Sequence, residues 1–100
     1  MTDVYTYGKT VRVTGTFRAL GVTLADPTTT TLIVETPGKV ETSYTYAAGG
    51  VTRDSVGVFH RDIAGNEAGT WSWRWVGTGA VADVDEGQFI ILESFLAGGP

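Results

Sequence analysis

Apolar and polar side chains alternate along most of this chain. In segment 9–18, Val11 and Val13 fall on one side of an extended chain, and Arg12 and Thr14 fall on the other. Successive side chains of a strand point to opposite faces, so this period of two predicts a strand with one face on a core. Similar segments, rich in β-branched and aromatic residues, recur along the sequence. The predicted strands are residues 3–7, 9–18, 30–36, 40–47, 58–63, 70–76 and 87–94.

Turn-forming residues separate these segments. Pro37-Gly38, Gly49-Gly50 and Gly77-Thr78-Gly79 are the clearest examples, and such signals recur roughly every 8–12 residues, the spacing typical of a β-sandwich. We therefore predict an all-β protein, an immunoglobulin-like β-sandwich of about seven antiparallel strands in two sheets. No stretch of convincing length has a helical period. Residues 80–86 fit one helical turn, a loop or a short strand equally well.

The length of 100 residues fits one domain. We expect a single immunoglobulin-like domain over residues 1–100, with a short N-terminal arm at 1–8 and a C-terminal tail at 95–100. The longest fully apolar run, residues 89–92, is far too short to span a membrane. Residues 1–10 lack the apolar core of a signal peptide. The sequence therefore predicts a protein made in a reducing cytoplasm that does not enter a membrane.

Charge and residue content argue against several kinds of chemistry. Seven Lys and Arg against eleven Asp and Glu give a formal charge of −4, which disfavours binding to nucleic acid phosphates. The absence of Cys excludes disulfides and thiolate metal sites. His60 is the single histidine and is expected to be a surface side chain. We interpret Asp83, Asp85 and Glu86 as a solvated acidic loop. The sequence thus predicts no catalytic residues, no metal and no cofactor.

Three tryptophans follow one another at two-residue spacing in the predicted strand 70–76. Trp71, Trp73 and Trp75 would share one face, and three exposed indoles would form a sticky patch. We expect Trp71 and Trp73 to fill the core and Trp75 to cover its edge. The alternative is that Trp75, beside Arg74, helps a sugar or a protein partner to dock.

Aromatic and apolar residues also lie near both ends of the chain. Tyr5 and Tyr7 stand in the N-terminal arm, and Phe95 and Leu96 follow the last predicted strand. Such residues either pack on their own domain or anchor onto a neighbour. The candidate binding residues are therefore Tyr5, Tyr7, Trp73, Arg74, Trp75, Phe95 and Leu96.

Two motifs carry a resemblance. Residues 54–60, DSVGVFH, followed by residues 69–75, GTWSWRW, resemble the E and F strands of filamin-type immunoglobulin-like domains. In such strands a glycine makes each turn, and an aromatic residue two positions later fills the sandwich. Phe59 stands where the pattern has tyrosine, and Arg61 stands where it has an apolar residue, which suggests a face that is exposed or that meets a partner.

Together with Asp26-Pro27-Thr28, Pro37-Gly38 and the 77–79 turn, these motifs resemble small structural proteins of tailed bacteriophages and prophages. The resemblance implies a non-enzymatic virion protein, a capsid decoration or head–tail module that acts through protein–protein contacts. Its implied partners are capsid or head–tail proteins, with homo-oligomers as a further possibility. An alternative function is a carbohydrate or cell-surface binding module, suggested by Trp73, Trp75, Tyr44 and Tyr46.

Overall fold

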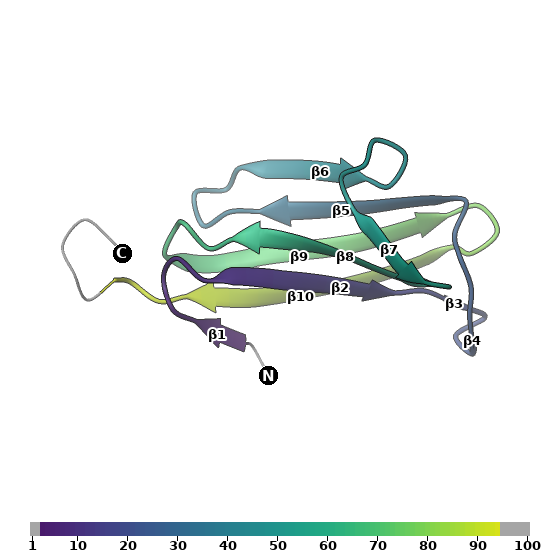
Figure 1. Ribbon diagram of the computed structural model, residues 1–100, viewed down its shortest axis with the longest axis horizontal. Helices are drawn as coiled ribbons and strands as arrows, with labels where there is room; N and C mark the ends of the chain where they lie inside the picture. The colour runs from purple at the N-terminus through teal and green to yellow at the C-terminus, as the bar shows by residue number, and fades with distance from the viewer. Residues whose placement is uncertain (1–2, 95–100) are drawn as a thin grey trace.

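The computed structural model describes residues 3–94 and contains strands but no helix in that range (Figure 1). The all-β prediction is confirmed. The strands are β1 (Asp3–Tyr5), β2 (Thr10–Thr16), β3 (Arg18–Ala19), β4 (Thr23–Leu24), β5 (Thr29–Glu35), β6 (Glu41–Thr45), β7 (Thr52–Ser55), β8 (Val58–Ala64), β9 (Gly69–Thr78) and β10 (Asp83–Ile91).

The strands form two main sheets and a small hairpin. The larger sheet has the order β1-β10-β9-β5-β6, the smaller has the order β2-β8-β7, and β3 pairs with β4. β1 runs parallel to β10, whereas every other pair is antiparallel. The edge strands are thus β1 and β6 in the larger sheet and β2 and β7 in the smaller sheet.

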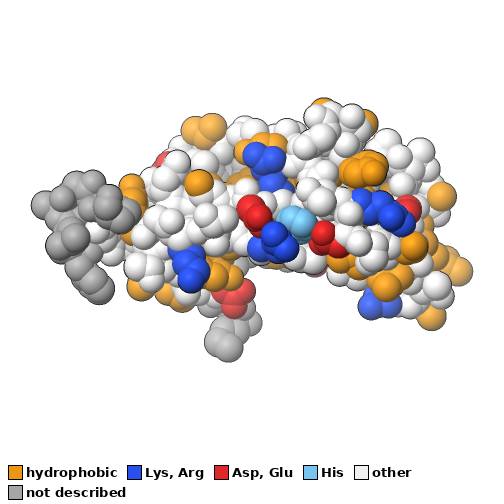
Figure 2. Space-filling model, in the orientation of Figure 1, with side chains coloured by type: hydrophobic (Ala, Val, Ile, Leu, Met, Phe, Trp, Pro, Cys, Tyr) orange, Lys and Arg blue, Asp and Glu red, His pale blue; other side chains and the backbone are white. Residues whose placement is uncertain are grey.

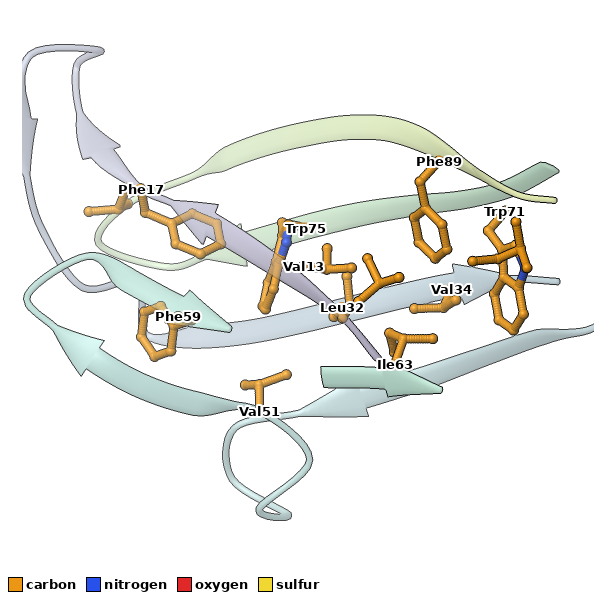
Figure 3. Close-up of a cluster of buried hydrophobic side chains, with 13 residues drawn as sticks. Val13, Phe17, Leu32, Val34, Val51, Phe59, Ile63, Trp71, Trp75 and Phe89 are labelled. Carbon is orange, nitrogen blue, oxygen red and sulfur yellow. The ribbon is translucent and has the colours of Figure 1, made fainter. Parts of the chain in front are cut away.

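The inner faces of the two sheets share one core (Figure 3). Along β2 the alternation produces this core directly, because Val11 and Val13 are buried while Arg12 and Thr14 are exposed. The buried cluster consists of Val11, Val13, Phe17, Leu32, Val34, Val51, Phe59, Ile63, Trp71, Trp75, Val81, Phe89 and Ile91. The described chain is therefore two sheets packed on a common apolar layer.

The three tryptophans divide differently from the prediction. Trp75 is 0% exposed and Trp71 is 4% exposed, while Trp73 is only partly buried. Trp75 is buried because Gly15 leaves room for it: a Cβ on Gly15 would lie 2.5 Å from the indole ring. Phe17 adds an edge-on contact with a centroid distance of 6.3 Å. The expectation that Trp73 fills the core and Trp75 covers its edge is therefore wrong.

Several element boundaries also differ. The acidic residues Asp83, Asp85 and Glu86 belong to the start of β10 and not to a loop. They are in a strand because β10 pairs with β9 over its whole length, from Asp83 opposite Gly77 to Ile91 opposite Gly69. β7 and the β3–β4 hairpin were not predicted. The four residues of β7 are all exposed, so no alternation marks this strand in the sequence.

Arg61 points into the sandwich, although the sequence suggested a face that is exposed or that meets a partner. It lies on the same side of β8 as buried Phe59 and Ile63. Its guanidinium carbon is 3.7 Å from the centre of the Tyr44 ring, and Nη1 donates to the Gly50 carbonyl at 2.8 Å. A cation–π contact and a hydrogen bond thus replace apolar packing at this position.

We predict that Trp71→Ala lowers the free energy of unfolding by about 3–5 kcal/mol, because it removes a buried aromatic ring. The Trp71 ring stacks on Phe89 with centroids 5.6 Å apart. Urea denaturation followed by circular dichroism measures the loss. Trp73→Ala is the matched control and should cost less, since that ring is partly exposed. A loss below about 1 kcal/mol for Trp71→Ala would contradict the observed packing.

Candidate interaction surfaces

The candidate residues chosen from the sequence do not converge on one site. Trp75 is completely buried, so it offers no surface for a sugar or a protein. Its indole nitrogen is buried without a hydrogen-bond partner, which is consistent with a packing role alone. Phe95 and Leu96 lie outside the described residues. The remaining candidates are Tyr5, Tyr7, Trp73 and Arg74.

Tyr5 and Trp73 both line a cleft between β2 and the β1–β10 edge of the larger sheet, which we call the β2-edge cleft. Its volume is about 570 Å³. The indole of Trp73 lies across Gly87, where a Cβ would come within 2.3 Å of the ring. The Tyr5 ring packs edge-on against Phe89 with centroids 6.0 Å apart. Two aromatic rings therefore form part of the walls of an open seam between the sheets.

The tyrosines of the N-terminal segment attach it to the rest of the domain. The Tyr7 hydroxyl donates to the Asn66 carbonyl at 2.9 Å, and the Tyr5 hydroxyl donates to the Asp3 carboxylate at 3.4 Å. Burial, followed by the charge of Asp3, raises the pKa of Tyr5. A raised pKa favours the protonated phenol, the form that can donate this hydrogen bond. These contacts give both tyrosines a structural role.

Arg74 lies on the outer face of the larger sheet and is already paired. Its Nη2 is 2.7 Å from a Glu86 carboxylate oxygen, and its Nε donates to the same oxygen at 2.9 Å. Glu86 is directly opposite Arg74 in the β9–β10 register. On the same two strands the Gln88 side chain donates to the Ser72 hydroxyl at 3.2 Å. This face therefore presents paired charges and few free polar groups.

A second cleft lies where β5 and β6 approach β8, and we call it the Tyr46 cleft. Its volume is about 550 Å³, and threonines 28–31 form much of its lining. Tyr46 is 49% exposed and packs edge-on against Phe59 at a centroid distance of 5.5 Å. Asp26 and Arg53 add an ion pair to the lining, with 3.1 Å between Nη2 and Oδ2. The cleft thus combines an exposed aromatic ring with hydroxyl and charged groups.

Asp26 connects the loop before β5 to the turn between β7 and β8. Its carboxylate accepts a hydrogen bond from the Gly57 amide at 2.7 Å and another from Arg53 Nε at 3.1 Å. These bonds, with that from Gly57 the larger influence, lower the pKa of Asp26. The sequence indicated a turn at Asp26-Pro27. It gave no sign of the partner at Gly57, which lies 31 positions away.

Charged side chains form a row on the outer face of the smaller sheet (Figure 2). Arg12 pairs with Asp62 at 2.8 Å, and His60 Nδ1 lies 2.7 Å from Asp54. The hydrogen bond from Arg12 lowers the pKa of Asp62. His60 is on the outer face, as expected, although its side chain is only 12% exposed. Opposite charges meet along this row, so it lacks the excess of positive charge that phosphate binding needs.

Apolar side chains project from the β3–β4 hairpin. Leu20 is 99% exposed and Val22 is 73% exposed, and we call these two residues the apolar tip. The Val22 amide donates to the Ala19 carbonyl at 3.0 Å, while Leu20 and Gly21 have φ of 51° and 71°. Positive φ at both central residues is the pattern of a type I′ turn, which favours Asn or Gly at each position. Leucine therefore occupies an unfavourable conformation with its side chain in solvent.

Within residues 3–94, no three His, Asp or Glu side chains gather into a group that could hold a metal ion. Nor does this range include a helix long and apolar enough to cross a membrane. No family model, curated protein or solved structure matches the chain. Proposals for its function therefore start from its surfaces.

We predict that the protein loses stability in acid and that Asp26 contributes to the loss. The pKa of Asp26 in the folded state is below its ordinary value of 3.8, so the folded state favours the carboxylate. The stabilisation is complete above pH 3.8 and disappears as the pH falls through the lowered folded value. Urea unfolding at a series of pH values should show a weaker acid dependence for Asp26→Asn than for the wild type.

Asp85→Asn is the matched control for this experiment. The Asp85 side chain is exposed and takes part in none of the side-chain hydrogen bonds or ion pairs found in residues 3–94. Its pH profile should follow that of the wild type. Equal acid dependence in the wild type and Asp26→Asn would contradict the role assigned to the Gly57 and Arg53 contacts.

Proposed function

We propose that this domain is a non-enzymatic module that binds a partner protein through its apolar tip. One observation carries the proposal: Leu20 is almost fully exposed and has a positive φ. The left-handed conformation costs about 1–2 kcal/mol for a residue with a Cβ. Full burial of a leucine side chain, in contrast, contributes about 1.5–3 kcal/mol. In the isolated domain this conformation costs free energy while the Leu20 side chain stays exposed. In a complex, an apolar pocket of the partner would bury the side chain.

The strand order supports an immunoglobulin-like sandwich as the scaffold. β10, β9 and β5 correspond to strands G, F and C, and β2, β8 and β7 correspond to strands B, E and D. In this scheme β6 is C′, and β1 is an A strand paired with G. Immunoglobulin-like folds gather loops at the two ends of the sandwich, where they commonly form binding surfaces. The β3–β4 hairpin, which carries the apolar tip, lies at such an end (Figure 1).

A capsid or head–tail protein of a tailed bacteriophage is the partner that the turn and core motifs suggest. This part of the proposal rests on the resemblance carried by residues 54–60 and 69–75 together with residues 26–28, 37–38 and 77–79, and under it the working protein would belong to the virion. A small apolar contact is weak alone. If several copies of the domain are linked, their contacts with a repeating particle surface would together hold them in place. Each bound copy raises the effective concentration of the next at its site.

The substitution Leu20→Asn tests the role of the tip. Asparagine tolerates positive φ, so the free energy of unfolding should stay the same or rise by about 0.5–1 kcal/mol. Binding should fall, because the apolar side chain is gone. Co-sedimentation with undecorated phage heads measures binding, and urea denaturation measures stability. Val4→Thr is the control, since Val4 is also exposed, at 54%, but lies on β1, toward the other end of the sandwich from the β3–β4 hairpin (Figure 1).

Each result of this experiment decides one part of the proposal. Wild-type protein that fails to co-sediment at every salt concentration argues against the virion partner. Co-sedimentation that survives Leu20→Asn argues against the tip as the binding surface. Loss of binding in Leu20→Asn, with binding retained in Val4→Thr, supports both.

Carbohydrate binding in the Tyr46 cleft is a second candidate function. The observation that favours it is the exposed Tyr46 ring beside several threonine hydroxyls and the Asp26–Arg53 pair. Sugars commonly combine stacking on an aromatic ring with hydrogen bonds to neighbouring polar groups. Trp73 and Tyr44 contribute less to this function, because Trp73 lies in the other cleft and Tyr44 packs on Arg61.

Glycan-array binding by the wild type, Tyr46→Phe and Tyr46→Ala tests this candidate. If stacking holds the sugar, Tyr46→Phe should retain most of the binding and Tyr46→Ala should lose roughly tenfold or more, as expected for a lost aromatic contact of about 1.4 kcal/mol. Circular dichroism checks that both variants are folded. No binding by the wild type to any glycan would reject a carbohydrate function.

A further inference from the structure

β2 forms the longest edge of the smaller sheet, and nothing in the described chain covers it. Its seven residues pair with β8 alone, in a register without a bulge, and include no proline. The opposite edge, β7, has four residues and a register shift between Arg53 and Ser55. Proteins normally protect edge strands by shortening, bulges, proline or charge. Apart from Arg12, β2 has none of these protections.

The hydrogen bonds at the two ends of β2 show which of its backbone groups are free. The Gly65 amide donates to the Lys9 carbonyl at 2.9 Å, and the Phe17 amide donates to the Gly57 carbonyl at 2.7 Å. Both bonds belong to odd-numbered residues of this segment. In an antiparallel pair the direction of the backbone groups alternates along the strand. Accordingly, the amides and carbonyls of Thr10, Arg12, Thr14 and Thr16 point away from β8.

There is space beside this edge for another strand. The β2-edge cleft separates residues 11–14 of β2 from β1 and β10. β1 pairs only with residues 89–91 of β10, so it lies opposite one end of β2. The side chains of Arg12 and Thr14 are exposed on the outer face. An approaching strand would thus meet unpaired backbone groups and side chains that do not block them.

We propose that a second copy of this chain pairs with the β2 edge, antiparallel and around a two-fold axis at Val13. In this register Arg12 is opposite Thr14 of the second copy, and Thr10 is opposite Thr16. The register keeps the two Arg12 side chains from facing each other, which would be unfavourable. Three strands from each copy would form one continuous sheet, and an isologous contact of this kind closes as a dimer.

The charges of β2 are compatible with an identical partner. Arg12 is neutralised by Asp62 of its own chain at 2.8 Å, and the other three residues that point their backbone groups outward are threonines. Each copy carries a net charge of −4, so added salt should strengthen the dimer by screening repulsion between copies. The pairing does not involve the apolar tip and is independent of the proposed function.

Sedimentation equilibrium from micromolar to millimolar concentration, at low and high salt, tests the pairing. Wild-type protein should show a monomer–dimer equilibrium that salt shifts toward the dimer. Thr14→Pro removes an outward amide from each copy but breaks no bond to β8, and proline is tolerated on a free edge. It should weaken association by roughly tenfold or more, since two hydrogen bonds are lost per dimer. Thr14→Val keeps both the amide and the branched shape and should associate like the wild type.

Amide hydrogen exchange on the wild type gives a second readout that needs no variant. The amides of Arg12 and Thr14 should exchange more slowly at high protein concentration than at low concentration. A protein that remains monomeric throughout overturns the proposal. So does a dimer that leaves these amides unprotected, or one that Leu20→Asn abolishes, because such a dimer uses another surface. If Thr14→Pro does not fold, the exchange data still decide.

Discussion

The contact between Trp75 and Gly15 is the constraint on which the arrangement of the two sheets depends. Trp75 lies in the middle of the larger sheet, between β5 and β10, and its ring faces β2 of the smaller sheet. Only glycine fits opposite it, because any Cβ at position 15 would overlap the ring. The ring thereby places β2 over the β9–β10 side of the larger sheet. This placement leaves the space between the sheets open along both sides of the sandwich, where the β2-edge cleft and the Tyr46 cleft lie.

The position of β2 explains why aromatic side chains line the β2-edge cleft. Trp73 is two residues from Trp75 and faces the same side, but it lies nearer the seam, where the smaller sheet no longer covers it completely. Gly87 permits the indole to lie flat over β10. An aromatic side chain at the border of the core is covered by protein on one side and open to solvent on the other. That is how Trp73 stays partly exposed while the other two tryptophans of the triplet are buried.

Alternation in the sequence was enough to predict the strands that bury one face. It did not predict which residues those faces contact across the sandwich. Val11 and Val13 fell on the core side as expected, because period two determines the face of a strand. The depth of each tryptophan depends on what lies across the sandwich, and Gly15 is 60 positions away from Trp75 in the sequence. β7 was missed for a different reason: with no buried side chain, a strand leaves no periodic pattern.

The candidate surfaces were still less predictable from sequence. Leu20 and Val22 flank a glycine and read as an ordinary turn until φ and exposure are known. Asp26 marks a turn, but its bond to Gly57 depends on the packing of two distant loops. Arg74 was a reasonable binding candidate by type, yet the β9–β10 register places Glu86 directly opposite. Pairing across strands thus gives Arg74 a partner within the sheet that residue type alone does not reveal.

The charged side chains Arg12 and Arg74 on the two outer faces are paired, and both proposed contacts lie instead at an end or an edge of the sandwich. Arg12 with Asp62 and Arg74 with Glu86 are exposed cross-strand pairs, and such pairs add little attraction for a partner. The apolar tip follows the C-terminal end of β2 in the chain. Antiparallel pairing of two β2 strands would therefore place the two tips at opposite ends of the dimer. A dimer of this form could hold two partner subunits at once, so a weak contact at each tip would gain from the linkage between them.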